Sequence, residues 1–389
     1  MPRDVWTAVE RAPPVGPALP VPTLLLAGVR QAGAVKTLVR LLMFVLFSGP
    51  AVLPAPAAFS SLYVFGDGVC SSTDNPNGGS IYYPDTYCNG LVWVEVLAKR
   101  QGLTYDASKN WSYFGHYSSE MVTHVNQFSP TNANTALFVV WVNDADFVYN
   151  MQYLYPDLRL ASWNSAMNGF LANHYQAITN LYAKGARTLV MPNAVDITEI
   201  PQYSGLPASE RSFIRQRVID FNTAFAALLD QARAVLPGVK IYMPDMFAVF
   251  DDVLAHPGNY GLVNPGTDAL EVSSLNPWYL DGPGAYYVFW DPFDPTAKVH
   301  EIAADTVQQM ISPVQITNLT LLNGSNRLDV ANLPIGLGGF VSGSSNLLSG
   351  AWTTMTNFDS ISATQAVFVP ASASLRYYRL QFPFAWTRP

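Results

Sequence analysis

Charged residues are scarce in this chain: Asp, Glu, Lys and Arg make up 13% of its 389 residues, against 49% hydrophobic residues. Disordered, highly charged proteins are therefore excluded, because such chains have too little apolar surface to form a core. Basic residues are scarcer still, with 21 Lys and Arg against 28 Asp and Glu, which gives a net charge of −7. Because no basic stripe is present to attract a phosphate backbone, we expect no nucleic-acid partner.

Cysteine is almost absent, with only Cys70 and Cys88 in the whole chain. The sequence also contains no His-Glu-x-x-His motif, no cysteine cluster and no calcium-loop pattern. Such patterns supply the ligands of many protein-bound metal ions, and we therefore expect neither a metal nor another cofactor. In an oxidising compartment an isolated pair of cysteines usually forms a disulfide, and two buried free thiols are the alternative.

The chain lacks an apolar run long enough for a membrane-spanning helix, which needs roughly 18 residues. The apolar run at residues 41–47 follows Lys36 and Arg40 and precedes the small-residue stretch Ala55-Pro56-Ala57. Basic residues, a short apolar run and a small-residue cleavage site are typical of a signal peptide. We therefore interpret residues 1–58 as a signal or targeting segment, with a membrane anchor as the alternative. We expect a secreted, periplasmic or cell-surface protein with no stable membrane span.

Between residues 59 and 312, segments typical of strands alternate with segments typical of helices. Residues 135–142 form an unbroken apolar run, which is typical of a strand covered on both faces of its sheet. The alternation predicts an α/β domain with a parallel sheet between helical layers and a site at the carboxyl ends of the strands. The other predicted strands are residues 61–65, 188–191 and 239–243, and the predicted helices are residues 92–101, 165–184, 209–235 and 295–311.

The composition changes at residue 313. Residues 313–389 contain only two acidic residues, Asp329 and Asp359, and show short alternating runs separated by Gly- and Ser-rich turns. This pattern predicts a small all-β, sandwich-like domain. We therefore expect a targeting segment (1–58), an α/β domain (59–312) and a C-terminal β domain (313–389).

Five short motifs lie in order along the α/β domain. They resemble the sequence blocks of the SGNH (GDSL-type) ester hydrolase and lipase family, whose fold is a three-layer, flavodoxin-like parallel sheet. The resemblance covers residues 60–310, and it implies a hydrolase that cleaves ester bonds with a Ser-His-Asp triad. The motifs are Phe65-Gly66-Asp67, Cys88-Asn89-Gly90, residues 110–115, residues 141–144 and residues 290–296.

Two triad positions differ from the family pattern. This chain has Gly68 where the family has its nucleophilic serine, and Asp294 where the family has its histidine base. The aspartate that orients the histidine corresponds to Asp291. Glycine has no side-chain atom that can attack an ester, and an aspartate beside Asp291 is a poor base unless burial raises its pKa. Loss of a triad member costs on the order of 10⁶ in kcat, so the ordinary mechanism is excluded.

The groups that stabilise the oxyanion are better preserved. The resemblance assigns this role to Gly115 and Asn143, while Trp141 replaces the glycine of the same block. Oxyanion donors and substrate binding alone retain about 10³–10⁴ of rate enhancement over water. We therefore include Gly115 and Asn143 among the candidate site residues.

A non-standard mechanism is suggested by one other pair of residues. Ser71 lies close to Gly68 in sequence, and His116 follows Gly115. A serine with a nearby histidine can act as nucleophile and base. The alternative interpretation is structural, with Ser71 as a helix-capping residue and His116 as a polar loop residue.

The resemblance also bears on the cysteines and on a cation site. The family's usual serines fall at positions 70 and 88, and this paired exchange implies a disulfide between Cys70 and Cys88 at the rim of the site.

Asp67, Asp291 and Asp294 are candidates for a cation site, since hard cations bind carboxylate oxygens. Because no metal-binding pattern accompanies them, we expect Asp67 to bond to the backbone of its own turn instead.

Two functions follow from these residues. The first is a ligand-binding pseudoenzyme, an ester hydrolase-family protein whose cleft binds an acyl ester or carbohydrate-type small ligand without cleaving it. The second is an active carboxylesterase, lipase or carbohydrate esterase with a non-standard nucleophile and base, such as Ser71 with His116. Fold alone does not decide between them, and the site residues favour the first.

Overall fold

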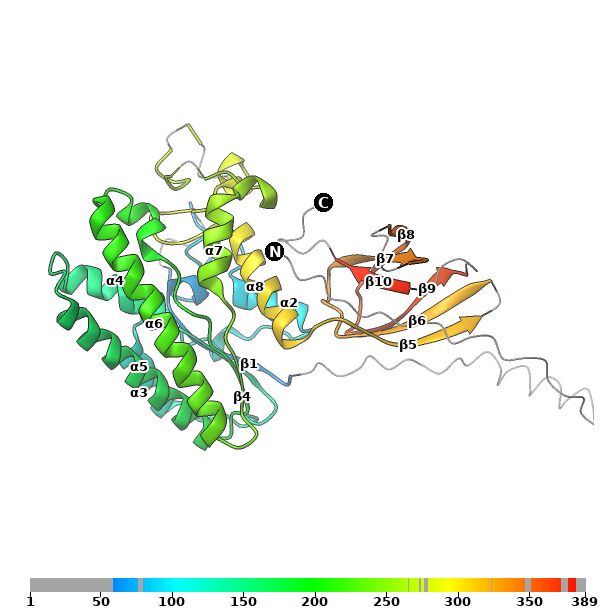
Figure 1. Cartoon of the computed structure of the whole chain (residues 1–389), viewed down its shortest axis with the longest axis horizontal. Helices are drawn as coiled ribbons and strands as arrows, with labels where there is room; N and C mark the ends of the chain where they lie inside the picture. Colours follow the sequence, from blue (N-terminus) through cyan, green and yellow to red (C-terminus); the bar gives the residue numbers. More distant parts are fainter. Residues whose placement is uncertain are drawn as a thin grey trace, which may run out of the picture.

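The computed structural model describes residues 59–75, 80–264, 266–272, 274–275, 279–322, 324–346, 351–371 and 377–382. The predicted targeting segment, residues 1–58, lies outside them. In the described part of the chain, none of the helices combines the length and the hydropathy that a membrane crossing requires. These residues form a larger α/β domain followed by a smaller β domain (Figure 1).

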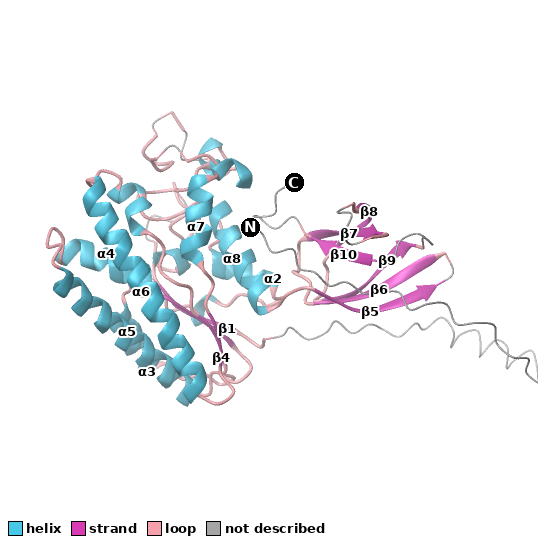
Figure 2. Ribbon diagram, in the orientation of Figure 1, coloured by secondary structure: helices cyan, strands magenta, loops and turns pink. Residues whose placement is uncertain are grey.

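A four-stranded parallel sheet forms the centre of the larger domain, as the sequence predicts. Its strands lie in the order β1 (Leu62–Gly66), β2 (Leu137–Trp141), β3 (Thr188–Val190) and β4 (Lys240–Tyr242). Each pair of neighbours is parallel, so the carboxyl ends of all four strands meet at one edge. Every residue of β1 and β2 is buried, because helices cover both faces of the sheet (Figure 2).

Alternate residues of each strand face opposite helical layers, because side chains alternate between the two faces of a sheet. Tyr63 and Phe65 of β1 pack into one core, and Leu62 and Val64 pack into the other. The helices of the first layer are α3 (Ser118–Gln127), α4 (Asn143–Tyr153), α5 (Leu160–Ala183) and α6 (Ala208–Val235), and those of the second are α2 (Trp93–Arg100), α7 (Met246–Ala255) and α8 (Ala297–Ile311). The predicted three-layer α/β class is confirmed.

The C-terminal residues form two antiparallel sheets, as expected for an all-β domain. One sheet has the order β5–β6–β9 and the other the order β10–β7–β8. Residues from both sheets, including Ile316, Leu328, Val341 and Tyr378, share one hydrophobic core. The strands are β5 (Gln315–Leu322), β6 (Ser325–Ala331), β7 (Gly338–Ser344), β8 (Thr353–Asp359), β9 (Thr364–Pro370) and β10 (Tyr377–Gln381).

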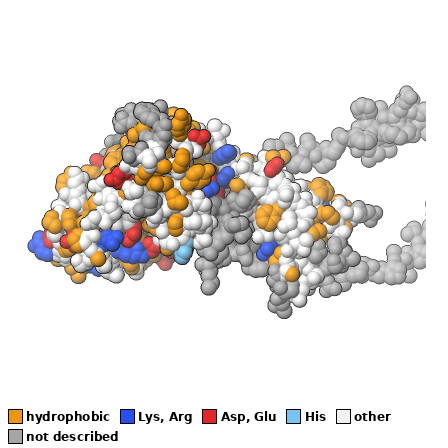
Figure 3. Space-filling model, turned by 90° about the horizontal axis from the view of Figure 1, so that it is seen from above, with side chains coloured by type: hydrophobic (Ala, Val, Ile, Leu, Met, Phe, Trp, Pro, Cys, Tyr) orange, Lys and Arg blue, Asp and Glu red, His pale blue; other side chains and the backbone are white. Residues whose placement is uncertain are grey.

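The two domains meet at the C-terminal end of α2. The backbone N–H of Ile335 donates to the carbonyl of Arg100 (3.1 Å). The Arg100 guanidinium forms a buried ion pair with Asp305 of α8 (2.9 Å), which fixes α2 against α8. Charged side chains are few on the face of the molecule shown in Figure 3, in keeping with the low charge of the chain.

Candidate active site

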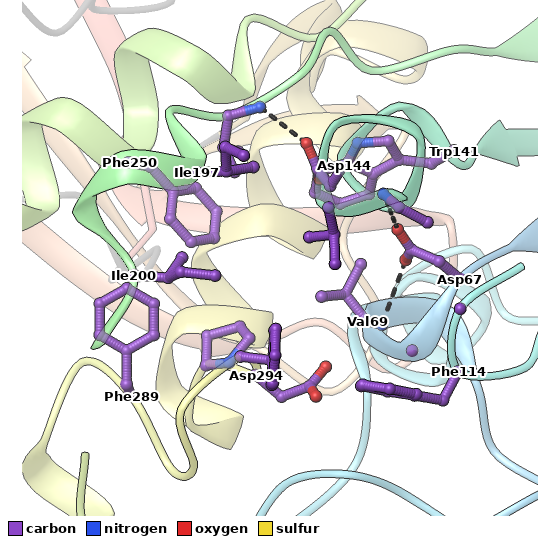
Figure 4. A pocket seen from close by; sticks show the side chains of 17 residues that line it. Asp67, Val69, Phe114, Trp141, Asp144, Ile197, Ile200, Phe250, Phe289 and Asp294 are labelled. Atoms are coloured by element: carbon purple, nitrogen blue, oxygen red, sulfur yellow. Dashed lines mark hydrogen bonds between the residues drawn. The ribbon is translucent and has the colours of Figure 1, made fainter. Parts of the chain in front are cut away.

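A pocket lies at the carboxyl ends of β1 and β2. The space between its walls, together with the open solvent at its mouth, is about 670 Å³. Among the described residues that line it there is no Lys, Arg or His, and the lining includes the carboxylic acids Asp67, Asp144 and Asp294 and the glycines Gly68 and Gly115. The apolar wall consists of Val69, Phe114, Trp141, Ala145, Val148, Val195, Ile197, Ile200, Phe250, Phe289, Phe293 and Pro295 (Figure 4).

The turn after β1 places Gly68 in the pocket wall. Gly68 begins a short 3₁₀ helix, η1 (Gly68–Cys70), whose N-cap is Asp67. The Asp67 carboxylate accepts hydrogen bonds from the backbone N–H of Val69 (3.3 Å) and of Ala145 (3.2 Å). Asp67 therefore bonds to the backbone of its own turn, as expected, and also fixes that turn to the start of α4.

Gly68 and Asp294, which we expect at the nucleophile and base positions of the family motif, lie next to each other. A Cβ atom built on Gly68 would lie 3.2 Å from Oδ1 of Asp294 and 3.0 Å from the ring of Phe114. The fold therefore brings Gly68 and Asp294 together. Gly68 has no side chain, so the groups that meet there are the Gly68 backbone and the Asp294 carboxyl group.

Asp291 holds the loop before α8 in place. Its Oδ1 accepts hydrogen bonds from the backbone N–H of Phe293 (2.8 Å) and of Asp294 (2.7 Å). Its Oδ2 accepts a hydrogen bond from the hydroxyl of Tyr82 (2.9 Å). Both carboxylate oxygens of Asp291 are thus engaged, and Tyr82 occupies the oxygen that is not bonded to the backbone.

Burial is the main influence on the carboxyl groups of the pocket. It raises the pKa of Asp294 well above its usual value, and the nearby carboxylates of Asp291, Asp67 and Asp74 raise that pKa further. Burial also raises the pKa of Asp67 to about 7, against the hydrogen bonds from Ala145 and Val69. A raised pKa favours the protonated form of Asp294, and a protonated carboxyl group cannot accept the proton of a nucleophile.

The predicted oxyanion groups are placed differently from one another. Gly115 lines the pocket with a φ of +77°, a conformation that glycine adopts without strain. Asn143 is fully buried, and its Nδ2 donates to the carbonyl of Pro192 (2.9 Å). The Asn143 amide is thus directed to the backbone after β3. The next residue, Asp144, lines the pocket instead, and its Oδ1 accepts a hydrogen bond from the backbone N–H of Val195 (2.9 Å).

Ser71 and His116 have separate hydrogen-bond partners. The Ser71 hydroxyl donates to Asp74. His116 Nδ1 donates to the carbonyl of Gly66 (2.8 Å), so its Nε2 accepts from Nδ1 of His124 (3.0 Å). Burial lowers the pKa of His116 to about 4. With both ring nitrogens engaged, His116 forms no nucleophile–base pair with Ser71 in this structure, and neither residue lines the pocket.

The expected disulfide is absent, and this prediction is wrong: Cys70 and Cys88 are buried free thiols. The Sγ of Cys70 accepts a hydrogen bond from Nε1 of Trp93 (3.2 Å). The thiol of Cys88 donates to the carbonyl of Gly90 (3.0 Å). Each sulfur atom therefore has its own partner in the core, which is the alternative that the sequence left open.

The free thiols lead to a testable expectation. Burial raises the pKa of Cys88 to about 12 and that of Cys70 well above its usual value, so almost no reactive thiolate forms in the folded protein. We expect iodoacetamide to modify neither cysteine in the native protein. In denaturant without reductant it should modify both, which intact-mass measurement detects as two added groups. A denatured, unreduced protein with no added group would contradict the free thiols.

Several site residues escaped the sequence analysis. Tyr82 contacts Asp291 across 209 positions of sequence, and nothing in its local pattern indicates that contact. Asp144 belongs to the family motif at residues 141–144, so that motif was the sequence signal that could have identified Asp144 as a site residue. The structure also places Phe250, Phe289 and Phe293 in the pocket wall. Among the described residues, no group of three or more His, Cys, Asp and Glu residues is arranged to hold a metal ion.

Comparison with known proteins agrees with this geometry. Residues 62–307 match the GDSL-like lipase/acylhydrolase family. The chain belongs to this family. A GDSL esterase/lipase of Arabidopsis thaliana is 25% identical over 346 residues, which cover 71% of this chain and 88% of the relative. The thermolabile hemolysin of Vibrio parahaemolyticus is 24% identical over 245 residues, covering 59% of this chain and 56% of the hemolysin.

Among solved structures, an acetylxylan esterase from Geobacillus stearothermophilus is similar to this chain. It is 11% identical, covers 66% of this chain and 96% of its own, and has a TM-score of 0.39. Residues 62–307, which match the family, include the parallel sheet and the loops at its carboxyl edge.

Proposed function

We propose that this GDSL-family protein is an exported, ligand-binding pseudoenzyme: its pocket binds a small ester or carbohydrate-type ligand and does not cleave it. The observation that carries the proposal is that a Cβ atom built on Gly68 would lie 3.2 Å from Oδ1 of Asp294, the two residues that we expect at the positions of nucleophile and base. Acyl transfer needs an oxygen nucleophile and a group that accepts its proton. Gly68 has no side-chain oxygen, and the raised pKa of Asp294 favours its protonated form, which accepts no proton.

The pocket itself supports a binding function. An apolar wall with a few polar groups is typical of sites for small organic ligands. The GDSL esterase/lipase names of the plant relatives favour a ligand with an ester or acyl group. For export, the support is the sequence of residues 36–57, with its two basic residues, its short apolar run and its Ala-Pro-Ala stretch.

The Ser71–His116 alternative has less support. The Ser71 hydroxyl is engaged by Asp74, and the two ring nitrogens of His116 are engaged by Gly66 and His124. A catalytic base must reach the proton that it abstracts, within about 3 Å. The hydrogen bonds of the folded chain keep both groups out of the pocket.

The test combines turnover with covalent labelling. Full-length protein is incubated with p-nitrophenyl acetate, p-nitrophenyl butyrate and a fluorophosphonate, with a serine-containing GDSL esterase as positive control. We expect hydrolysis no faster than with heat-unfolded protein at the same concentration, and no fluorophosphonate adduct by mass spectrometry. An adduct on Ser71 or Ser72, or saturable ester hydrolysis, would establish the active-enzyme alternative.

A further inference from the structure

One carboxylate oxygen in the pocket wall has no hydrogen-bond partner among the described residues. This atom is Oδ2 of Asp294, a residue that lines the pocket and is 2% exposed. Figure 4 shows the carboxyl group pointing into the pocket, toward Phe114. The other two acids of the lining, Asp67 and Asp144, accept hydrogen bonds from backbone N–H groups. Buried polar atoms without a partner are rare in folded proteins, so the Asp294 oxygen indicates that a ligand supplies a donor.

The groups that surround Asp294 restrict the charge of that donor. The described residues that line the pocket include three carboxylic acids and no Lys, Arg or His. The nearby charges that influence Asp294 are those of Asp291, Asp67 and Asp74, and all of them are negative. A cationic donor would supply the missing countercharge together with the missing hydrogen bond, whereas an anionic ligand would be repelled.

Aromatic rings and an open space adjoin the same carboxyl group. Phe114 and Phe293 both line the pocket, and their rings meet nearly at right angles, with centroids 5.7 Å apart and an interplanar angle of 83°. The faces of aromatic rings attract cations, and pockets lined by such rings bind alkylated ammonium groups. A Cβ atom built on Gly68 would lie 3.2 Å from Oδ1 and 3.7 Å from Oδ2 of Asp294. The glycine therefore leaves room for a ligand head group beside the carboxyl group.

The single unpartnered oxygen decides between kinds of cation. Hard metal ions need several oxygen ligands, and no group of three or more His, Cys, Asp and Glu in the described part of the chain is arranged to hold a metal ion. A primary ammonium has three N–H donors to pair, in a wall that is mostly apolar. A tertiary ammonium has one N–H and three alkyl groups, which match one open carboxylate oxygen within an apolar wall.

We propose that the pocket binds a tertiary ammonium ligand with an apolar body: Asp294 accepts its N–H, and the rings of Phe114 and Phe293 contact its alkyl groups. This inference deepens the proposed function and rests on it, because it assigns a positive head group to the small ligand. Asp294, at the expected position of the base, is then the anionic anchor of the ligand, and Gly68 provides the space for the head group.

Binding of such a ligand releases a proton from the protein. Burial and the neighbouring carboxylates raise the pKa of Asp294 and favour its protonated form. Beside an ammonium the carboxyl group ionises, its proton passes to solvent, and the ligand keeps its own N–H. Affinity should therefore rise with pH up to the pKa of Asp294 in the free protein. The titratable groups nearby act in the same direction, because each is an acid whose ionisation adds negative charge. They are Asp67, Asp74, Tyr82, Tyr87, Cys88, Asp144 and Asp291.

The experiment compares three probes with an eight-carbon chain by calorimetry on the full-length protein: N,N-dimethyloctylamine, 1-octanol and octanoate. At pH 7 we expect the amine to bind at least about tenfold more tightly than either other probe, because only the amine is a positively charged donor. Its affinity should rise at least about tenfold between pH 5 and pH 8, a range in which the amine itself stays protonated. Titrations in phosphate and in Tris, which differ in ionisation enthalpy, should show net release of protons.

Substitutions at the two residues beside the head group test their roles. Asp294→Asn keeps the size of the side chain and removes its charge, so amine affinity should fall at least about tenfold, proton release should be lost and 1-octanol binding should change little. Gly68→Ala should also weaken amine binding, because its Cβ atom would occupy the space beside the carboxyl group. Asp359→Asn, at an exposed position of the β domain, is the matched control and should change none of these properties.

The outcomes separate this inference from the proposed function. If 1-octanol or octanoate binds as tightly as the amine, or if Asp294→Asn retains full amine affinity, the ammonium selectivity is overturned and the binding function stands. Saturable hydrolysis of p-nitrophenyl butyrate would refute the pseudoenzyme proposal, whatever the amine affinity. If none of the three probes binds, both fail together.

Discussion

A triple variant with Gly68→Ser, Asp294→His and Tyr82→Phe is expected to hydrolyse p-nitrophenyl acetate about 10³ times faster than the wild-type protein. An intact triad contributes about 10⁶ to kcat. In this chain the Asn143 amide donates to Pro192, and loss of one oxyanion donor costs about 10²–10³. The restored triad should therefore recover only part of the usual rate.

The geometry around position 68 favours this reconstruction. A Cβ atom there would lie 3.2 Å from Asp294 Oδ1, so a histidine at position 294 begins next to the new serine. The Cβ atom would also lie 3.0 Å from the ring of Phe114. That ring is 45% exposed, so it has room to move by the few tenths of an ångström that the serine requires.

Tyr82 is the third position because of its hydrogen bond to Asp291. A catalytic histidine must be oriented by this aspartate, and the Tyr82 hydroxyl occupies the Asp291 oxygen that is not bonded to the backbone. Tyr82→Phe removes the competing hydroxyl and keeps the ring. We therefore expect the triple variant to be faster than Gly68→Ser with Asp294→His alone.

The matched control is the same triple variant with Gly68→Ala in place of Gly68→Ser. It places a Cβ atom at the same point and carries no hydroxyl. Initial rates of p-nitrophenol release, together with fluorophosphonate labelling of residue 68, measure the difference. Equal rates for the serine and alanine variants would show that the scaffold no longer supports the triad.

The free energy of unfolding is expected to fall by about 4 kcal/mol as the pH rises from 6 to 9, from Asp67 and Asp146 alone. Burial raises the pKa of Asp67 to about 7 and that of Asp146 to about 8 in the folded chain. An aspartate with a raised pKa holds its proton more tightly when folded. Its contribution to stability is therefore present at low pH and is lost as the pH rises through the folded-state pKa.

Three histidines act in the opposite sense below pH 6.5. Burial lowers the pKa of His116 and His174 to about 4 and that of His300 to about 3. Their neutral, buried forms stabilise the fold above pH 6.5, and this contribution is lost as the pH falls toward 4. The two effects together place maximum stability near pH 6.

Urea unfolding at pH 6, 7.5 and 9 measures this dependence. Asp146→Asn is the diagnostic variant, because Asp146 accepts the N–H of Ser118 through Oδ1 (2.8 Å), which an amide oxygen can still accept. The variant should lose about 3 kcal/mol less than the wild type between pH 6 and 9. Asp359→Asn should leave the pH dependence unchanged. A stability that rises toward pH 9 would contradict the raised pKa values.

The sequence by itself predicted the layers of the fold and the family, and it is the basis for the two exchanges that we propose at the site. Apolar runs such as residues 135–142 encode a strand buried on both faces, and motif positions at strand ends meet at one edge because the sheet is parallel. Helix α4 escaped prediction, because its sequence is largely polar and only Phe147 and Met151 join the core among its large apolar side chains. Tertiary packing decides such helices.

Only the tertiary structure decided which side chains face the pocket and what each one bonds. It directed Asn143 to Pro192, gave Ser71 and His116 separate partners, and kept Cys70 and Cys88 as free thiols. These outcomes depend on rotamers and on contacts between residues far apart in the chain. The hydroxyl of Tyr82 reaches Asp291 only because the folded loops meet there, and no local pattern records such a contact.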